Sequence, residues 1–265
     1  KMFNEKDPTV LPWKDLGVDL VLECTGAFTS TEKASLHLTA GAKKVLISAP
    51  GKDEMLTIVN GVNDDKFTGT ETIVSASSCT TNCLAPLLKI IEDNFGIEKG
   101  FMSTVHAYTA DQNAMDNMHK KGINSRRGRA SAHNIVPTST GAAKSIGLVI
   151  PSLKGKLDGI AYRVPTIDGS MIDVTLELKV PVTKELINET IKNNQNDAIN
   201  ETLKYTEDPI VSSDVIGKKR GCTFDSLLTN VIEVEGKQLV KLVGWYDNEY
   251  GYTYQMLCTA KKMFK

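Results

Sequence analysis

The chain has 265 residues and a formal net charge of −1, with 31 basic and 32 acidic side chains. Such a balanced chain lacks the basic footprint that nucleic acid or an anionic membrane attracts, so we expect neither as a partner. No apolar run approaches the roughly 18 residues needed to cross a bilayer, and no signal-peptide pattern opens the chain.

The N-terminal third predicts strands and a helix in alternation. Residues 17–26 form an apolar run typical of a buried parallel strand. Residues 30–40 have helical spacing and begin with Ser30, a good cap. Two further β-branched runs follow at 44–50 and 72–76. This order of strand, helix and strand predicts a βαβ unit.

Cys79 lies where the strand at 72–76 gives way to a helix. Ser77 and Ser78 precede it as natural caps, and apolar residues follow at helical spacing. The N-terminus of a helix favours a thiolate, so we predict that Cys79 is a nucleophile with a lowered pKa. A buried core cysteine is the alternative, and we prefer that interpretation for Cys83.

His106 is the best candidate for a base that serves this nucleophile. It ends a β-like stretch, and the C-terminal ends of strands are where α/β proteins place their chemistry. We interpret His37, His119 and His133 as structural or solvated. The spacing alone leaves open whether His106 contacts Cys79.

The five cysteines indicate free thiols. Their number is odd, and no Cys-x-x-Cys pattern repeats, which argues against a disulfide framework and a structural zinc site. We therefore expect no metal and a reducing, cytoplasmic location, which suits a reactive Cys79.

The chain beyond the Cys79 helix changes character. Long β-rich stretches are expected at 100–109, 157–164, 170–180, 229–235 and 238–246, and helices at 184–196 and 248–264. Long strands with few helices predict a mixed or antiparallel sheet, an α+β arrangement. Residues 110–137 form a long polar loop, and loops of this length are usually functional.

Four motifs, in order, resemble the family of phosphorylating glyceraldehyde-3-phosphate dehydrogenases. They are Ser-Cys-Thr-Thr-Asn-Cys-Leu-Ala-Pro at 78–86, Thr-Val-His-Ala-Tyr-Thr at 104–109, Pro-Thr-Ser-Thr-Gly-Ala-Ala-Lys at 137–144 and Trp-Tyr-Asp-Asn-Glu-Tyr-Gly-Tyr at 245–252. The similarity runs through the whole chain. One departure is large, because the family begins with a glycine-rich dinucleotide-binding βαβ unit that residues 1–265 do not include.

The resemblance implies two domains and an assembly. Residues 1–78 and 247–265 would form a partial, Rossmann-type NAD(P)-binding domain, and residues 79–246 a catalytic domain with a mixed or antiparallel sheet. In the family, the loop that matches 110–137 is ordered by neighbouring subunits, which implies a homotetramer.

The resemblance also implies a reaction of glycolysis, the oxidative phosphorylation of glyceraldehyde 3-phosphate to 1,3-bisphosphoglycerate. Cys79 would attack the aldehyde to form a thiohemiacetal. His106 would stabilise the oxyanion and take the hydroxyl proton as hydride passes to NAD, or to NADP. Inorganic phosphate would then attack the thioester.

Further site residues are carried over from the family by position. The substrate phosphate would be held by Thr109 and Arg163, with Asp111 nearby. Inorganic phosphate would be bound by Ser78, Thr80, Thr140 and Gly141, with Arg127 adding charge. The cofactor would be contacted by Thr25, Gly26, Phe28, Ser48 and Asn248. Read without the family, Arg163 would be a surface salt bridge, Thr140 and Asn248 helix caps, and Thr25-Gly26 an ordinary turn.

Two alternatives stay open. One is a related dehydrogenase of another short sugar phosphate, such as erythrose 4-phosphate. The other is a truncated assembly or binding module without dehydrogenase activity, which the missing glycine-rich unit favours and the intact motifs oppose. We favour an enzyme whose N-terminus precedes this chain. The residue that separates NAD from NADP lies in the missing unit, and residues 1–265 alone are expected to bind NAD weakly.

Overall fold

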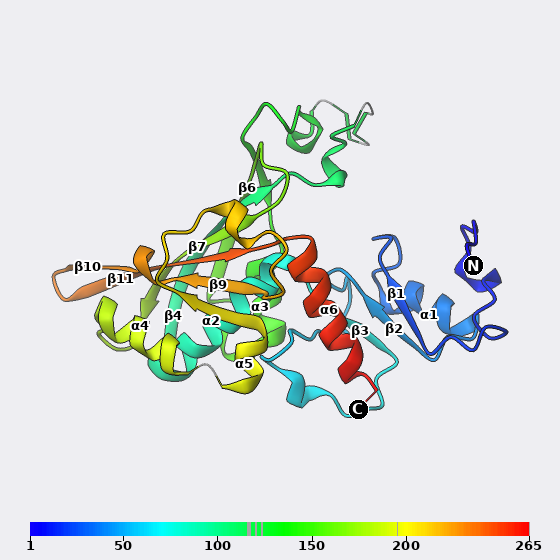
Figure 1. The fold of residues 1–265 in the computed structure, drawn as a ribbon, viewed down its shortest axis with the longest axis horizontal. Helices are drawn as coiled ribbons and strands as arrows, with labels where there is room; N and C mark the ends of the chain where they lie inside the picture. The colour runs from blue at the N-terminus through cyan, green and yellow to red at the C-terminus, as the bar shows by residue number, and fades with distance from the viewer. Residues whose placement is uncertain (116–117, 120, 123, 195, 265) are drawn as a thin grey trace.

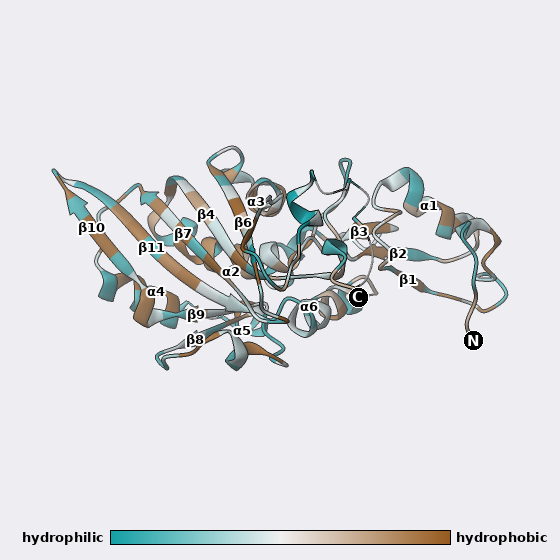
Figure 2. Ribbon diagram, turned by 90° about the horizontal axis from the view of Figure 1, so that it is seen from above, coloured by the Kyte–Doolittle hydropathy of each residue, from teal (hydrophilic) through white to brown (hydrophobic). Residues whose placement is uncertain are grey.

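Two β-sheets organise the fold, a small parallel sheet from the N-terminal third and a large mixed sheet from the rest of the chain (Figure 1). The structure is a computed structural model, and it describes residues 1–115, 118–119, 121–122, 124–194 and 196–264. Helix α6 (Tyr250–Lys262) lies between the two sheets in both ribbon views (Figures 1 and 2). The predicted combination of an α/β unit with a mixed-sheet unit is confirmed.

The small sheet contains three parallel strands in the order β1-β2-β3. Its elements are β1 (Leu20–Glu23), α1 (Thr31–Thr39), β2 (Lys44–Ile47) and β3 (Ile73–Ser75). Ser30 caps α1, because its Oγ accepts a hydrogen bond from the Lys33 N–H at 3.4 Å. The predicted βαβ order is confirmed, although each strand is shorter than its apolar run.

Helix α6 completes the core of the small sheet. Its Met256, together with Met263 just beyond its end, packs against the buried Leu46 of β2 and Val74 of β3. Lys44 reaches the same end of the helix and donates a hydrogen bond to the Met263 carbonyl oxygen at 2.5 Å, across 219 residues of sequence. The last helix of the chain is therefore part of the first structural unit.

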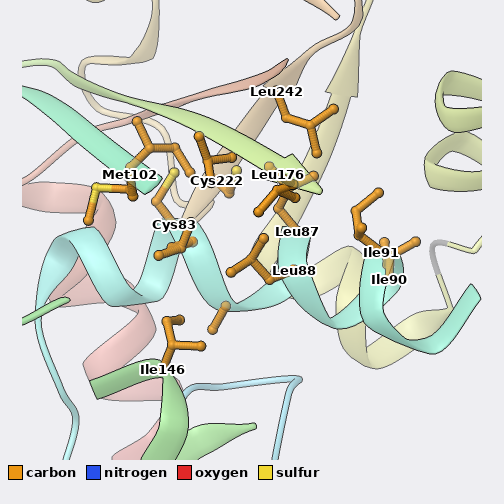
Figure 3. Close-up of a cluster of buried hydrophobic side chains, with 14 of the residues drawn as sticks. Cys83, Leu87, Leu88, Ile90, Ile91, Met102, Ile146, Leu176, Cys222 and Leu242 are labelled. Atoms are coloured by element: carbon orange, nitrogen blue, oxygen red, sulfur yellow. The ribbon is translucent and has the colours of Figure 1, made fainter. Parts of the chain in front are cut away.

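Helix α2 (Cys79–Phe95) forms the centre of the large unit. It begins at the predicted cap, since Ser78 Oγ accepts a hydrogen bond from the Thr81 N–H at 3.1 Å. Figure 3 shows its Leu87 and Leu88 in the hydrophobic cluster that also contains Ile146 of helix α3 (Ala142–Val149). Burying one such leucine contributes about 1.5–3 kcal/mol, so this packing holds the first turn of α2, and hence Cys79, in place.

The large sheet has eight strands. They are β4 (Ile97–Ala107), β5 (Val136–Ser139), β6 (Leu157–Val164), β7 (Ser170–Leu178), β8 (Leu203–Thr206), β9 (Cys222–Asp225), β10 (Asn230–Val234) and β11 (Lys237–Tyr246). Their order is β5-β6-β4-β7-β11-β9-β8, with β10 paired to β11. The pairs β4–β6 and β8–β9 are parallel and the others antiparallel, so the sheet is mixed as predicted.

The two faces of the large sheet differ. Alternate residues of β4, β7 and β11 are buried against helices α2, α3 (Ala142–Val149) and α4 (Lys184–Asn193). The residues between them face outward, and hydrophobic and hydrophilic bands alternate along these strands (Figure 2). Phe101 on this outer face is 68% exposed and Leu239 44%.

Several short elements and boundaries differ from the sequence-based expectation. Helix α4 ends at Asn193 rather than 196, and a separate helix α5 (Asp197–Thr202) follows. Helix α6 begins at Tyr250 rather than 248. Strand β5 lies at the end of the expected loop 110–137, in which residues 116, 117, 120 and 123 lie outside the described residues. Strands β8 and β9 were not expected at all.

Across the described ranges, no helix is long and apolar enough to span a membrane. The same residues contain no group of three or more His, Cys, Asp or Glu side chains that could hold a metal ion. All five cysteines are free thiols.

Candidate active site

A strained corner presents Cys79 at the start of α2. Ser77, between β3 and the helix, has a positive φ of 59°, which a residue with a Cβ adopts at a cost of about 1–3 kcal/mol. Hydrogen bonds hold it there. Its N–H donates to Ser75 Oγ at 3.0 Å, and its carbonyl oxygen accepts from the Tyr252 hydroxyl at 3.0 Å. The chain therefore turns sharply from strand to helix and leaves Cys79 half-buried at the corner.

His106 meets Cys79 at this corner. It is the penultimate residue of β4, as predicted, and its side chain is buried. The distance from Cys79 Sγ to His106 Nε2 is 3.4 Å, although 27 positions separate the two residues in sequence. The contact that the spacing left open is thus formed.

The tautomer of His106 follows from its second nitrogen. His106 Nδ1 lies 2.7 Å from the Ala107 carbonyl oxygen, which can only accept a hydrogen bond. Nδ1 therefore carries the proton, and Nε2 presents a lone pair to the Cys79 thiol. This arrangement suits a general base.

Burial controls the charge of the pair. Burial and, after it, the nearby Arg163 charge together lower the pKa of His106 to about 4. Burial also raises the pKa of the Cys79 thiol, while Arg163 and hydrogen bonds from Thr80 oppose that rise. The predicted lowering of the Cys79 pKa is wrong for this geometry, because desolvation outweighs the helix N-terminus. The resting pair is a neutral thiol beside a neutral imidazole.

A cationic cluster adjoins His106. Strands β4 and β6 place Arg163 directly opposite His106 in the sheet register. Arg163 Nη1 donates to the Ala107 carbonyl oxygen at 3.1 Å and to Thr109 Oγ1 at 3.0 Å, and lies 3.1 Å from His106 Nδ1. The hydroxyl of Thr109 in turn donates to Asp111.

Asp111 joins the second arginine to this cluster, because Arg127 forms an ion pair with its carboxylate. Thr109, Asp111 and Arg163, which were assigned to the substrate phosphate, are thus connected in one network beside His106. The network also includes Arg127, which was assigned to inorganic phosphate.

Tyr246 is a site residue that sequence reasoning missed. Its hydroxyl lies 2.9 Å from Thr80 Oγ1 and 2.8 Å from Thr104 Oγ1, and its ring packs edge-on against His106 at 5.8 Å. Tyr246 is fully buried at the end of β11. The hydroxyl of Thr80 is therefore paired with Tyr246.

The residues assigned to inorganic phosphate occupy two places. Ser78 lies next to Cys79, but its Oγ bonds Thr81 as the cap of α2. Thr140 and Gly141 precede α3, where Thr140 Oγ1 accepts a hydrogen bond from the Ala142 N–H at 3.2 Å. In the described part of the chain, no hydrogen bond links Thr140 to Cys79 or His106.

The residues assigned to the cofactor lie mostly at the C-terminal ends of parallel strands. Thr25 and Gly26 follow β1, and Ser48 follows β2 and bonds the Glu23 carbonyl oxygen through its N–H at 3.0 Å. Phe28 contacts the imidazole of His37 edge-on at 5.8 Å. This edge is where α/β sheets bind their ligands.

Asn248 is tied to the histidine strand by a residue that sequence reasoning also missed. Ser170 Oγ accepts a hydrogen bond from the Ala107 N–H at 3.0 Å and donates one to Asn248 Oδ1 at 2.6 Å. Asn248 is 5% exposed and Ser170 1%. No sequence pattern signals this pairing, since 78 positions separate the two residues.

Comparisons with known proteins agree with this geometry. The family model for the glyceraldehyde 3-phosphate dehydrogenase C-terminal domain matches residues 78–248. The chain is 56% identical over all 265 residues to a glyceraldehyde-3-phosphate dehydrogenase of Clostridium pasteurianum, and spans 78% of that protein. It is 56% identical over 259 residues to the Clostridium acetobutylicum protein, with 98% of the chain and 76% of the relative covered.

A third relative, from Mycobacterium avium, is 56% identical over 250 residues, with 94% of the chain and 72% of the relative covered. All three carry the name of a dehydrogenase, which defines the class of this protein as an oxidoreductase. The family model covers more than half of the chain and the relatives align along nearly all of it. The chain belongs to the glyceraldehyde-3-phosphate dehydrogenase family.

Proposed function

We propose that the protein oxidises glyceraldehyde 3-phosphate and phosphorylates the product to 1,3-bisphosphoglycerate. The observation that carries this proposal is the contact of 3.4 Å between Cys79 Sγ and His106 Nε2, beside a network of two arginines. A thiol with a base suits attack on an aldehyde, and guanidinium groups suit a phosphorylated substrate.

In the first step, Cys79 Sγ attacks the aldehyde carbon as its proton passes to His106 Nε2. The imidazole is unprotonated at neutral pH, because its pKa is lowered to about 4, so Nε2 has a lone pair available for this proton. The Ala107 carbonyl oxygen holds the Nδ1–H at 2.7 Å and so keeps the ring aligned. His106 returns that proton to the carbonyl oxygen, which gives the thiohemiacetal hydroxyl. It takes the proton again as the carbon is oxidised to the thioester and loses a hydride, for which bound NAD would supply the acceptor.

Arg163 couples substrate binding to this base. Its charge lies against His106 Nδ1 at 3.1 Å and opposes protonation of the ring. A substrate phosphate placed on Arg163 and Thr109 neutralises that charge and makes the imidazole more basic. Asp111, as an anion, repels a phosphate, so we assign it to orienting Arg127 and Thr109 rather than to contact.

The second phosphate is inorganic phosphate, which releases the acyl group from Cys79. We propose Ser78, Thr80, Thr140 and Gly141 for its binding. Gly141 supports this role because it opens α3 without a side-chain cap, which leaves N–H groups of the first turn for an anion. For Thr80 the backbone is the better candidate, since its hydroxyl bonds Tyr246 at 2.9 Å.

NAD is the proposed cofactor, and it supplies the hydride acceptor when bound. The residues present fit it: Thr25, Gly26 and Ser48 meet at the C-terminal edge of the parallel sheet. Gly26 has a positive φ of 72° and open space where a Cβ would stand, so the backbone is accessible there. Asn248, fixed by Ser170, presents a buried carboxamide that can orient a ligand amide. We assign this role to residues 1–78 with 247–265, and the chemistry to 79–246.

The test is the oxidation of glyceraldehyde 3-phosphate by the purified protein in the presence of NAD and inorganic phosphate. The formation of reduced nicotinamide measures the rate. Cys79→Ser should abolish turnover, whereas Cys258→Ser, a matched change on α6, should leave it intact. Full activity of Cys79→Ser would show that Cys79 is not the nucleophile.

A panel of substrates and cofactors refines the proposal. The ratio of kcat/KM values for glyceraldehyde 3-phosphate and erythrose 4-phosphate gives the specificity for the aldehyde. The same ratio for NAD and NADP gives the specificity for the cofactor. A cytoplasmic location stays a prediction, supported by five free cysteines, which suit a reducing compartment.

A further inference from the structure

A cleft away from Cys79 and His106 has the character of an anion site. It has a volume of about 880 Å³, within the range of small-molecule sites. It is bordered by β8, β9, the short 3-10 helix Ser212–Val215, the loop 217–220 and Tyr254 of α6. None of the residues assigned above to substrate, phosphate or cofactor lines it.

Positive charge gathers on its walls. Four basic side chains line the cleft: Lys204, Lys218, Lys219 and Arg220. Within the described residues, none of them forms an ion pair with a carboxylate. Like charges held close together without counter-charges repel one another, so an anionic ligand would stabilise this group.

The two carboxylates in the cleft do not cancel this charge. Asp214 Oδ2 accepts a hydrogen bond from the Val211 N–H at 2.8 Å. Asp208 Oδ2 accepts one from the Thr206 hydroxyl at 3.3 Å. Both are directed at their own loop, and four basic against two acidic side chains still leaves an excess of two positive charges.

The basic loop is fixed rather than loose. The Lys219 carbonyl oxygen accepts a hydrogen bond from the buried Gln255 Nε2 at 2.7 Å, and the Lys218 N–H donates to the Val215 carbonyl oxygen at 3.1 Å. A Cβ at Gly251 would stand 3.0 Å from the carbonyl oxygens of Lys218 and Arg220, so α6 packs directly against this backbone.

This packing leaves the loop's side chains to project from a rigid base. The ammonium group of Lys219 lies over the ring of Tyr254 at 5.1 Å, which further restricts it. Because little ordering remains for binding to impose on the backbone, the loop is pre-organised for a ligand.

We propose that this cleft is a second ligand site, which binds a phosphate-bearing small molecule through Lys204, Lys218, Lys219 and Arg220. Ammonium and guanidinium groups are the usual partners of phosphate oxygens, and the hydroxyls of Thr223 and Tyr254 add polar groups at the walls. An excess of two charges matches a phosphate or diphosphate group. The site is independent of the catalytic reaction.

Isothermal titration with inorganic pyrophosphate tests this proposal, with inorganic phosphate as the second probe. Arg163→Leu removes the catalytic phosphate network and isolates the new site. In that background, the change Lys218→Ala with Lys219→Ala and Arg220→Ala should weaken pyrophosphate binding at least about tenfold. The matched control Lys154→Ala with Lys237→Ala and Lys261→Ala removes the same charge from exposed positions elsewhere and should change the Kd less than about twofold.

The outcomes separate cleanly. Loss of binding in the loop variant, with binding kept in Arg163→Leu alone and in the control, supports the site. An equal loss of binding in the loop variant and in the control would mean that pyrophosphate is attracted by the general charge of the protein, and would overturn the proposed site. Loss of pyrophosphate binding in Arg163→Leu alone would assign the anion to the substrate site and would also overturn the proposed second site. If the triple variant unfolds, Lys219→Ala is measured in its place, with Lys237→Ala as control.

Tighter binding of pyrophosphate than of phosphate identifies a diphosphate ligand, and equal binding identifies a monophosphate.

Discussion

Reactivity at Cys79 depends on its neighbour more than on its exposure. Cys24 is exposed and Cys79 only half-buried, so simple access favours Cys24. Cys79, however, has His106 Nε2 at 3.4 Å to take its proton during attack. Since burial raises the pKa of the thiol, we propose that this help makes the cysteine reactive at neutral pH.

Alkylation measures this effect. Iodoacetamide at neutral pH should label Cys79 before Cys24, Cys83, Cys222 or Cys258. His106→Asn should slow labelling of Cys79 by about 10²-fold, because the base is lost, and leave labelling of Cys24 unchanged. Peptide mapping by mass spectrometry gives both rates. Faster labelling of another cysteine in the native protein would contradict the assignment.

The buried His106 also makes stability depend on pH. Its pKa is about 4 in the folded protein and about 6.5 when unfolded, so the unfolded chain binds the proton more tightly. The stabilising contribution is complete above about pH 6.5 and is lost as the pH falls toward 4. It amounts to about 3 kcal/mol.

Denaturant unfolding at several pH values checks this. The free energy of unfolding should fall more steeply between pH 7 and pH 4 in the natural protein than in His106→Asn. Parallel curves for the two proteins would mean that His106 titrates normally and is not desolvated.

At the scale of elements, a buried polar chain holds the turn after β1. Trp13 Nε1 donates to His37 Nδ1 at 3.2 Å, and His37 Nε2 donates to Glu23 Oε2 at 2.9 Å. The other oxygen of Glu23 accepts the Thr25 N–H at 2.8 Å. His37 is therefore structural, as expected, but its role is to satisfy a carboxylate that is itself buried.

Replacing His37 tests the importance of this pair. His37→Leu leaves the Glu23 carboxylate buried without its partner, so we expect a loss of about 3–5 kcal/mol in the free energy of unfolding. His133→Leu, on an exposed loop, is the matched control and should change stability by less than about 0.5 kcal/mol. Thermal or denaturant unfolding gives both values. A loss below about 1 kcal/mol for His37→Leu would show that water reaches Glu23.

Local pattern predicted the elements that carry their own cap or apolar run, and it missed short elements that depend on pairing with distant strands. The caps Ser30, Ser78 and Thr183 could be predicted from the sequence, because each hydroxyl accepts a hydrogen bond from the backbone N–H three residues later. Strands β8 and β9 have four residues each. They form because β8 pairs with β9 and β9 pairs with β11, which no local pattern encodes.

The candidate site shows the same division. Cys79 and His106 were found because each stands at the end of an element. Tyr246 and Ser170 were missed because their roles arise from contacts across 142 and 78 residues of sequence, respectively. The direction of the Cys79 pKa was wrong because the sequence shows the helix N-terminus but not how deeply the thiol is buried.

At the scale of the whole molecule, the outer face of the large sheet favours self-association. Phe101 is 68% exposed there, and Leu239 and Tyr162 are 44% and 36% exposed. Apolar side chains gathered on an open sheet face are typical of an interface. This supports the homotetramer, which stays a prediction.

Sedimentation of a charged variant tests the assembly. Phe101→Lys places a charge on the outer face and should shift the protein toward smaller species. Leu148→Lys, at a position on α3 that is 51% exposed, should leave the assembly as it is. A natural protein that sediments as a monomer at all concentrations would end the proposal.

The return of α6 to the small sheet has a consequence for biosynthesis. Leu46 and Val74 are synthesised long before Met256 and Met263, which cover them. The Lys44–Met263 contact spans 219 residues, which at about 5–20 residues per second takes roughly 10–40 seconds to translate. Throughout that interval this unit exposes an apolar surface on the nascent chain, so a ribosome-bound chaperone has that long to act on it.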